Sequence, residues 1–265
     1  MHEYIALFCT ALRAGGAPET TVRARREHLQ HLARRVNASE PSEITEAVLL
    51  AYFAGQSWAP ETRRARRASM RKFWQWLAAS GVCDDVSACL PPVRTPQPAP
   101  RPCPDLAYRA ALAKAKPRER LMLRLAAELG LRRGEVAAIH ARDVSDDLGG
   151  RSLVVHGKGG KRRVVPLPAG LAVEVDATAA GGYLFPGRDD GHLSPRWVGR
   201  VIAGLLPPGL TMHTLRHRFA SRAWMNGVDV FVIQDILGHA SPSTTRRYVA
   251  VPSTEARRAV EGLAA

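Results

Sequence analysis

The second half of the chain carries four short motifs whose side chains suit chemistry on a phosphodiester. The motifs are Gly130-Leu131-Arg132-x-x-Glu135, Gly157-Lys158-Gly159, His213-x-x-Arg216-His217, and Leu237-Gly238-His239 followed nine residues later by Tyr248. A phosphodiester under attack gathers negative charge on its non-bridging oxygens. The guanidinium groups of Arg132 and Arg216 offer planar pairs of donors to such oxygens, and the imidazoles of His213 and His239 exchange protons near neutral pH. These residue types therefore indicate phosphoryl transfer.

The order and spacing of the motifs resemble those of the tyrosine recombinase (phage integrase) family, and the resemblance extends along nearly the whole chain. It implies a site-specific DNA recombinase in which Tyr248 is the nucleophile and forms a 3′-phosphotyrosine intermediate. It also implies that Lys158 is the general acid that protonates the leaving 5′ oxygen. Because the phosphotyrosine bond conserves the energy of the broken phosphodiester, strand ligation needs no nucleotide, and we expect no cofactor.

Neighbouring residues extend this interpretation. A strongly positive pocket favours ionisation of the Tyr248 phenol, which otherwise titrates at about pH 10. Glu135 follows Arg132 by three residues, so we expect it on the same helical face, where it orients that arginine. We expect His217 to face a different way from His213 and to support the structure rather than the chemistry.

Other chemistries compete for parts of the same motifs. His213 and His217 have the i, i+4 spacing of a zinc-binding pair, but Thr214 stands where such a motif has its glutamate, and no Cys or carboxylate lies nearby in the sequence. We therefore predict no metal site. The glycine turn around Lys158 lacks the Ser or Thr of a P-loop. Taken singly, each motif has an ordinary explanation as a surface ion pair, a turn or a packed tyrosine, and only their co-occurrence argues for catalysis.

Two alternatives keep the DNA partner and change the reaction. A non-catalytic DNA-binding protein that retains the fold would have lost the nucleophile or an arginine. All six candidate catalytic positions are filled, however: Arg132, Lys158, His213, Arg216, His239 and Tyr248. A type IB topoisomerase would use the same phosphotyrosine chemistry to relax supercoils without a specific site, and the small helical N-terminal part of the chain argues against it.

The composition favours a polyanionic partner. The 265 residues carry a net charge of +14, with a pI of about 10.6. Both parts of the chain are basic, with 14 basic against 9 acidic residues up to Cys103 and 24 against 15 after it. Clustered Lys and Arg gain free energy by releasing counterions from phosphates, so a nucleic acid is the expected partner, and the family resemblance implies double-stranded DNA. Ribosomal proteins, membrane-surface proteins and proteins of biased composition share such a charge balance. With no long apolar run and no paired cysteine spacing, we expect a protein of the bacterial cytoplasm, associated with the nucleoid rather than a membrane.

A proline-rich segment divides the chain. Seven prolines in residues 91–104 preclude a continuing helix and favour an extended connector. Apolar residues at helical spacing predict helices at 20–36, 45–53, 61–80 and 118–130, and in several segments after Ser194. Two β-rich runs around a glycine turn predict a hairpin with Lys158 at its tip.

The expected fold class is mainly α with a small β-sheet. We predict a helical, SAM-like core-binding bundle at 1–90, the linker at 91–104, an α+β tyrosine recombinase catalytic domain at 105–251 and a C-terminal helix at 252–265. The resemblance implies that the two domains form a C-shaped clamp around DNA, without the additional arm-binding domain of lambda-type integrases. The predicted helix at 61–80 places four arginines on neighbouring turns as DNA contacts: Arg63, Arg64, Arg67 and Arg71. A solvated basic face with no partner is the alternative.

The family resemblance also implies assembly on DNA. Two protomers bind inverted half-sites, two such dimers form a tetrameric synapse, and the C-terminal helix docks on a neighbouring protomer. We favour phage or mobile-element integration and excision, with an accessory directionality factor as a further partner. Leu129 stands where Xer recombinases usually carry Thr, which disfavours the alternative of Xer-type chromosome dimer resolution. Cassette or inversion switching is a further role that the sequence leaves open.

Overall fold

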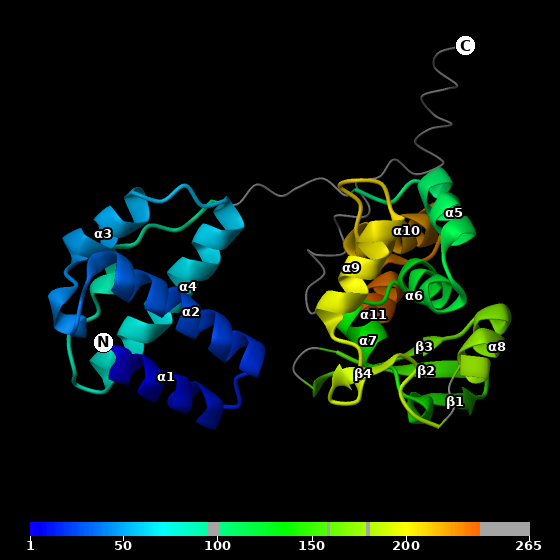
Figure 1. Cartoon of the computed structure of the whole chain (residues 1–265), viewed down its shortest axis with the longest axis horizontal. Helices are drawn as coiled ribbons and strands as arrows, with labels where there is room; N and C mark the ends of the chain where they lie inside the picture. The colour runs from blue at the N-terminus through cyan, green and yellow to red at the C-terminus, as the bar shows by residue number, and fades with distance from the viewer. Residues whose placement is uncertain (95–100, 158–159, 179–180, 239–265) are drawn as a thin grey trace, which may run out of the picture. The chain divides into compact units, whose positions relative to one another are not determined.

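The computed structural model describes residues 1–94, 101–157, 160–178 and 181–238. They belong to two compact units, Met1–Pro98 and Ala99–Ala265 (Figure 1). The predicted catalytic residues Lys158, His239 and Tyr248 lie outside the described residues, as does the predicted C-terminal helix at 252–265.

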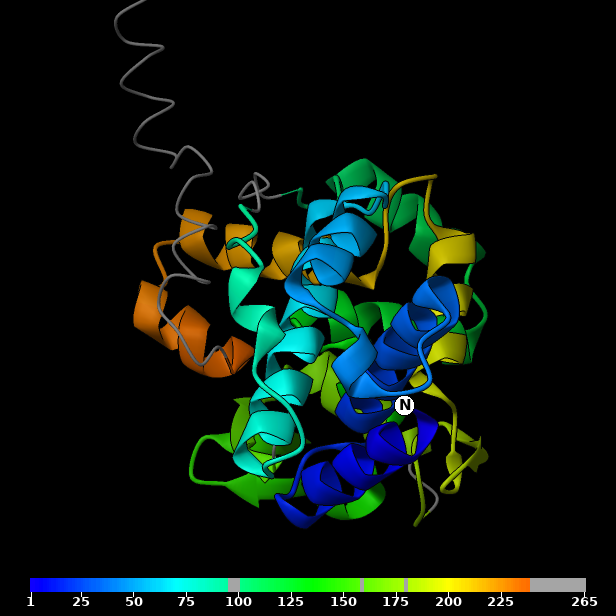
Figure 2. The ribbon, with the colours of Figure 1, turned by 90° about the vertical axis from the view of Figure 1, so that its left-hand side faces the viewer.

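The N-terminal unit is helical throughout its described part. Its helices are α1 (His2–Ala14), α2 (Glu19–Val36), α3 (Glu46–Ala54) and α4 (Pro60–Ala79), with short 3₁₀ turns at Pro41–Glu43 and Val86–Cys89 (Figure 2). The last three helices confirm those predicted from apolar spacing, whereas α1 was not predicted. Local chemistry fixes where two of them start: the Thr45 hydroxyl accepts a hydrogen bond from the Val48 N–H, and Pro60 occupies the first position of α4, where its missing N–H costs nothing.

Aromatic side chains from α1 and α4 fill the core of this unit. Phe73, Trp74 and Leu77 of α4 are fully buried. The ring of Phe8 on α1 lies 5.3 Å from the ring of Phe73, edge to face. One face of α4 therefore packs into the core, as its apolar spacing predicts.

The second unit is mixed α and β. Its helices are α5 (Asp105–Lys114), α6 (Pro117–Glu128), α7 (Arg133–Ala137), α8 (Ala169–Thr178), α9 (Pro195–Leu205), α10 (Met212–Met225) and α11 (Val230–Leu237). Its strands are β1 (Val144–Asp147), β2 (Gly150–His156), β3 (Arg162–Pro166) and β4 (Pro186–Asp189), with a 3₁₀ turn at Ala141–Asp143. Helix α6 packs against α10 through a core that includes Leu123, Leu125 and Leu215. The mainly helical chain with one small sheet confirms the expected fold class.

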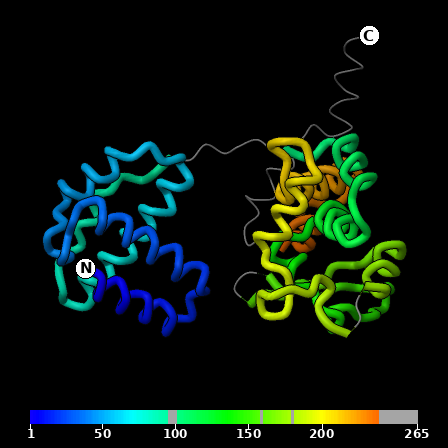
Figure 3. Tube along the Cα trace, viewed as in Figure 1, coloured from blue at the N-terminus to red at the C-terminus, as the bar shows by residue number. Residues whose placement is uncertain are grey.

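Strands β1, β2 and β3 form an antiparallel sheet in that order. The β2–β3 hairpin confirms the predicted one, while β1 was not predicted. In the hairpin Val155 lies opposite Arg163, and Leu153 lies opposite Val165. Side chains alternate across a strand, so Arg163 shares the face of Val165, which is buried. Figure 3 traces the chain from this sheet to the helices packed beside it. In the described part of the chain, no helix has the length and apolar character required to cross a membrane.

Candidate active site

Arg132 owes its position to the tight turn between α6 and α7. Gly130 adopts a left-handed conformation with φ of +67°, and a Cβ there would lie 2.6 Å from Leu237 Cδ2 and 2.7 Å from Phe219 Cδ1. Only glycine meets both demands. Leu131 is then fully buried, and Arg132 follows as the N-cap of α7 with 42% of its side chain exposed. The turn thus anchors one residue in the core and presents the next to solvent.

Arg216 reaches the same region from α10. Its Nη1 donates to the carbonyl of Gly130 and its Nη2 to the carbonyl of Leu237, both at 2.6 Å. The side chain is only 3% exposed. Arg216 therefore connects the α6–α7 turn to the end of α11. Arg132 contacts the same helix end, because its Nη2 donates to the Gly238 carbonyl at 3.3 Å. The described part of the Leu237-Gly238-His239 motif thus lies against both predicted catalytic arginines.

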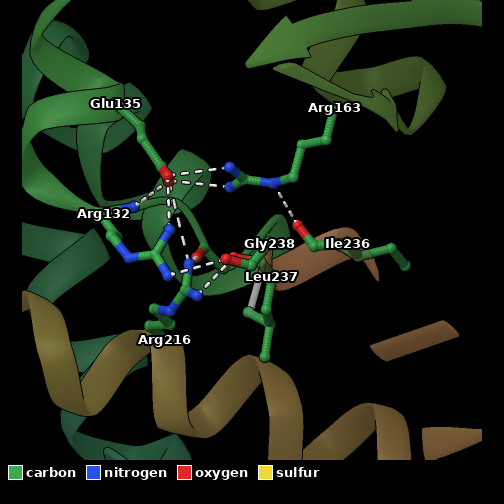
Figure 4. A network of polar contacts seen from close by, with 8 residues as sticks. Arg132, Glu135, Arg163, Arg216, Ile236, Leu237 and Gly238 are labelled. Atoms are coloured by element: carbon green, nitrogen blue, oxygen red, sulfur yellow. Dashed lines mark hydrogen bonds and ion pairs between the residues drawn. The ribbon is translucent and has the colours of Figure 1, made fainter. Parts of the chain in front are cut away.

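Glu135 is the centre of this network (Figure 4). Its carboxylate accepts from the backbone N–H and Nη1 of Arg132, each at 2.8 Å, and from Nη1 and Nη2 of Arg163, each at 2.9 Å. Arg216 Nη1 lies 3.9 Å away. Burial would raise the pKa of Glu135, but the hydrogen bonds from Arg163 and Arg132 outweigh it and lower the pKa to about 2. Glu135 is therefore a carboxylate at neutral pH, and it contacts Arg132 as predicted.

A cavity of about 540 Å³ opens beside this network. Its lining consists of Arg132, Arg133, Arg196, Gly199, Arg200, Thr211, Met212, His213 and Arg216. Within the part of the chain that the structure describes, no carboxylate belongs to that lining, and its charged side chains are guanidinium groups beside one imidazole. Three of the six predicted catalytic residues, Arg132, His213 and Arg216, therefore meet at one concave, positively charged surface suited to an anion.

The expectation that His217 faces a different way from His213 is wrong. The two rings lie side by side on α10, with Nε2 to Nε2 at 3.0 Å, because residues i and i+4 share a helical face. His217 Nδ1 accepts the backbone N–H of Arg101 at 3.2 Å, so a neutral His217 carries its proton on Nε2 and donates it to His213. His217 thus fixes the orientation of the His213 ring. Among the described residues, no group of three His, Cys, Asp or Glu side chains is arranged to hold a metal ion.

The predicted DNA-contacting arginines of α4 make bonds within their own unit. Arg67 donates to the Leu90 carbonyl from Nε at 3.1 Å and from Nη2 at 2.8 Å, and Arg71 Nη1 lies 3.5 Å from the Ser87 carbonyl. Arg63 donates to the carbonyls of Phe53 and Gln56. Only Arg64 projects to the surface, 63% exposed, in an ion pair with Glu61. Three of the four side chains therefore bond to the end of α3 or to the segment at 87–90, and DNA contact by this set stays a prediction.

Residues 106–255 match the sequence description of the phage integrase family. The chain belongs to that family. It is 35% identical over 225 residues to the tyrosine recombinase XerC of Rhodospirillum centenum, an alignment that covers 76% of this chain and 65% of the relative's own length. It is 31% identical over 274 residues to XerD of Brucella suis biovar 1, covering 89% of this chain and 88% of the relative.

Solved structures of tyrosine recombinases share the fold. A lambda integrase dimer bound to a COC′ core site matches with a TM-score of 0.74 at 18% identity, covering 94% of this chain and 76% of that one. XerH bound to its difH substrate matches with a TM-score of 0.68 at 19% identity, covering 91% and 78%. At such identities the likeness concerns the fold alone, so the roles of individual residues rest on the geometry above.

Sequence reasoning missed four arginines at this site. Arg133, Arg196 and Arg200 line the cavity, and Arg163 binds Glu135. Two signals were available: Arg196 and Arg200 stand at i, i+4 in a predicted helix, and Arg163 interrupts the apolar face of a strand that continues with Val165. An arginine on the buried face of a strand requires an acidic partner, which here is Glu135.

Proposed function

We propose that this tyrosine recombinase cuts and rejoins a specific duplex through a 3′-phosphotyrosine at Tyr248, without metal or ATP. The observation that carries the proposal is the cavity in which Arg132, Arg216 and His213 meet and whose described lining holds no carboxylate. A scissile phosphate seated there meets fixed donors as negative charge grows on its non-bridging oxygens. Donors held in place before the reaction cost no reorganisation in the transition state.

The two arginines differ in how they are held. Arg216 is nearly buried and bonded to two backbone carbonyls, so its guanidinium is a rigid source of positive charge at the base of the site. Arg132 is 42% exposed and gives Glu135 one Nη1 N–H and its backbone N–H, and its Nη2 also contacts the Gly238 carbonyl at 3.3 Å. A guanidinium has five N–H donors, so others are left for a phosphate. We assign both to stabilising the non-bridging oxygens.

Proton transfers fall to the remaining predicted residues. We assign Tyr248 as the nucleophile, Lys158 as the general acid for the leaving 5′ oxygen, and His213 and His239 as the groups that handle the phenol proton or donate to the phosphate. Lys158 follows the described end of β2, and His239 follows Gly238, whose carbonyl accepts from Arg132. Gly238 thus contacts the arginine network directly, and β2 pairs with β3, the strand that carries Arg163. Both positions support these assignments.

Double-stranded DNA is the proposed partner. The lambda integrase and XerH structures that share this fold were solved on their DNA sites, the former as a dimer. We propose that this chain likewise binds inverted half-sites as a dimer and recombines as a tetramer, with the helical bundle at 1–90 as the core-binding domain. We also propose that the C-terminal helix at 252–265 docks on a neighbouring protomer and that an accessory factor sets direction.

Two biological roles are open to this activity. Integration and excision of a phage or mobile element remains our first proposal. Chromosome dimer resolution is the second candidate, favoured by relatives named XerC and XerD that align with 76% and 89% of the chain. Plasmid substrates separate the two: a resolvase recombines two copies of one site, whereas an integrase joins two sites of different sequence.

The reaction is tested on DNA that the protein itself selects. The Tyr248→Phe variant, which should bind and not cut, is used to select a site from a random-sequence duplex library. Duplexes of this selected site are then nicked at successive positions, so that a short strand is lost after cleavage and the covalent product is trapped. We expect the wild-type chain to form a denaturant-stable DNA adduct in excess EDTA, and Arg132→Ala and Arg216→Ala to bind without forming it. Strand cleavage that requires magnesium and leaves no adduct would contradict the proposal.

A further inference from the structure

Arg163 holds a central place in the site although no reaction step has been assigned to it. It lies on β3 with its side chain directed to the buried face and 12% exposed. Its three donor nitrogens are all engaged: Nε donates to the Ile236 carbonyl at 2.6 Å, and Nη1 and Nη2 donate to the two oxygens of Glu135 at 2.9 Å each. One side chain thus joins the hairpin, the start of α7 and the last turn of α11 (Figure 4).

The geometry of the carboxylate shows what Arg163 prevents. A carboxylate accepts a guanidinium most strongly as a fork, with one N–H to each oxygen. At Glu135 that mode is taken by Arg163, and Arg132 is left with a single Nη contact to Oε1 and its backbone N–H to Oε2. Arg132 therefore touches Glu135 without forming a fork with it. Its Nη2 contacts the Gly238 carbonyl at 3.3 Å, and its other guanidinium N–H groups stay at the cavity.

Packing fixes Arg163 in this role. A Cβ on Gly238 would lie 3.1 Å from both Cδ and Nη1 of Arg163, so the side chain runs tightly past the end of α11. Its bond to the Ile236 carbonyl satisfies an acceptor at that helix end. A movement of the Arg163 side chain away from Glu135 would disturb its bond to the Ile236 carbonyl and its packing against Gly238.

We propose that Arg163 is a positioning residue that saturates Glu135 and so keeps Arg132 available to the scissile phosphate. Without Arg163, the buried carboxylate recruits Arg132 as a fork, and donors aimed at the phosphate turn toward Glu135 instead. This inference rests on the proposed function, because it assumes that Arg132 acts on a phosphate. It differs from a simple packing role because the loss of activity is caused by the charge of Glu135, so removing that charge should relieve part of the loss.

The test is a double-variant cycle in the full chain, measured as single-turnover cleavage of the nicked selected site. Arg163→Met should slow cleavage about 10- to 100-fold, as is typical when a residue that holds a functional side chain in place is removed, while DNA affinity stays nearly unchanged. Adding Glu135→Gln should restore part of the rate, because a neutral amide does not draw Arg132 into a fork. The double variant is therefore expected to cleave faster than Arg163→Met alone.

Arg124→Met provides the matched control. Arg124 forms a comparable fork with Glu128, at 2.9 Å to each oxygen, and also contacts Glu174, and its side chain is 19% exposed. Neither it nor its partners line the cavity. Arg124→Met should lower thermal stability without changing the cleavage rate. The control therefore separates the general loss of a half-buried ion pair from the specific change in how Arg132 is held.

The outcomes are distinct. The inference is overturned if Arg163→Met cleaves at the wild-type rate. It is also overturned if the double variant is slowed by the product of the factors measured for Arg163→Met and Glu135→Gln alone. If Arg163→Met does not fold, Arg163→Lys replaces it: a single ammonium cannot occupy both oxygens, so the variant should be slow and should again be relieved by Glu135→Gln. A wild-type chain that forms no adduct contradicts the proposed function instead.

Discussion

Replacing Glu135 by glutamine tests how much the arginine network stabilises the catalytic unit. The carboxyl is 5% exposed, and its pKa falls from the ordinary 4.5 to about 2 in the folded chain. A difference of that size corresponds to about 3 kcal/mol of stability at neutral pH. Glutamine also leaves Arg163 buried beside a neutral group, and breaking a buried pair typically costs about 3–5 kcal/mol. Both arguments give a loss of about 3 kcal/mol or more.

The pH dependence has a fixed sign. A carboxyl whose folded pKa is lowered contributes stability that is fully present above its unfolded pKa and is lost as the pH falls through the folded pKa. The difference between the wild type and Glu135→Gln should therefore be constant at neutral pH. It should then shrink as the pH falls from 4.5 toward about 2.

Hydrogen exchange followed by mass spectrometry, at increasing urea, measures this locally. Peptides from α6 and α10 report the free energy of opening of the catalytic unit, and peptides from α2 and α4 provide an internal control in the other unit. Asp176→Asn, which removes an exposed partner of Arg151, is the control variant and should have a much smaller effect. Equal stability of Glu135→Gln and wild type, or a difference that does not change with pH, would refute the reasoning.

Three further predictions concern the other assigned parts. If Lys158 is the general acid, Lys158→Ala should not cleave a substrate with a normal 5′ oxygen but should cleave a 5′-bridging phosphorothiolate, whose sulfur leaves unprotonated. Arg132→Ala and Arg216→Ala should not recover on that substrate, because they stabilise the non-bridging oxygens. Equal rescue of all three variants would show that Lys158 has no separate role as the acid. In α4, Arg64→Ala should lower the salt dependence of DNA affinity by about one counterion, while Arg67→Ala, which loses two bonds to the Leu90 carbonyl, should mainly lower the melting temperature of the N-terminal unit. The reverse pattern in DNA titrations and thermal melts would show that Arg67 is the DNA contact. Truncation after Val251 should leave half-site binding nearly intact but weaken cooperative filling of the full site in gel-shift titrations; unchanged cooperativity and cleavage would exclude docking of the tail on a neighbour.

Local sequence patterns predicted most of the elements, but they missed the helices α1, α5 and α8 and the strands β1 and β4. The apolar spacing of α2, α3, α4 and α6 and the glycine-separated runs of the hairpin are properties of a few turns of chain. Strand β1 has four residues and a mostly exposed burial pattern, so it is defined by its partner β2 rather than by its own sequence. The missed helix α1 did carry a usable signal, since Ile5, Phe8 and Cys9 are buried at helical spacing.

At the site, too, some residues were predicted from the sequence and others were not. The order of the motifs predicted Arg132, Arg216 and His213 as catalytic residues, and all three line one cavity in the structure. The error at His217 was geometric, because i, i+4 residues of a helix share a face. The acceptors of Arg63, Arg67 and Arg71 could not be predicted, since they are backbone carbonyls whose position depends on how α3 and the segment at 86–90 pack against α4.

The most direct test of the account is the identity of the residue that becomes linked to DNA. The wild-type chain is trapped on the nicked selected site in EDTA, the adduct is digested with nuclease and protease, and the peptides are sequenced by mass spectrometry. The account predicts one modified peptide, carrying a nucleotide 3′-phosphate on Tyr248, and no adduct from Tyr248→Phe under conditions where that variant still binds the site. An adduct that persists in Tyr248→Phe, or one mapped to another residue, would contradict it.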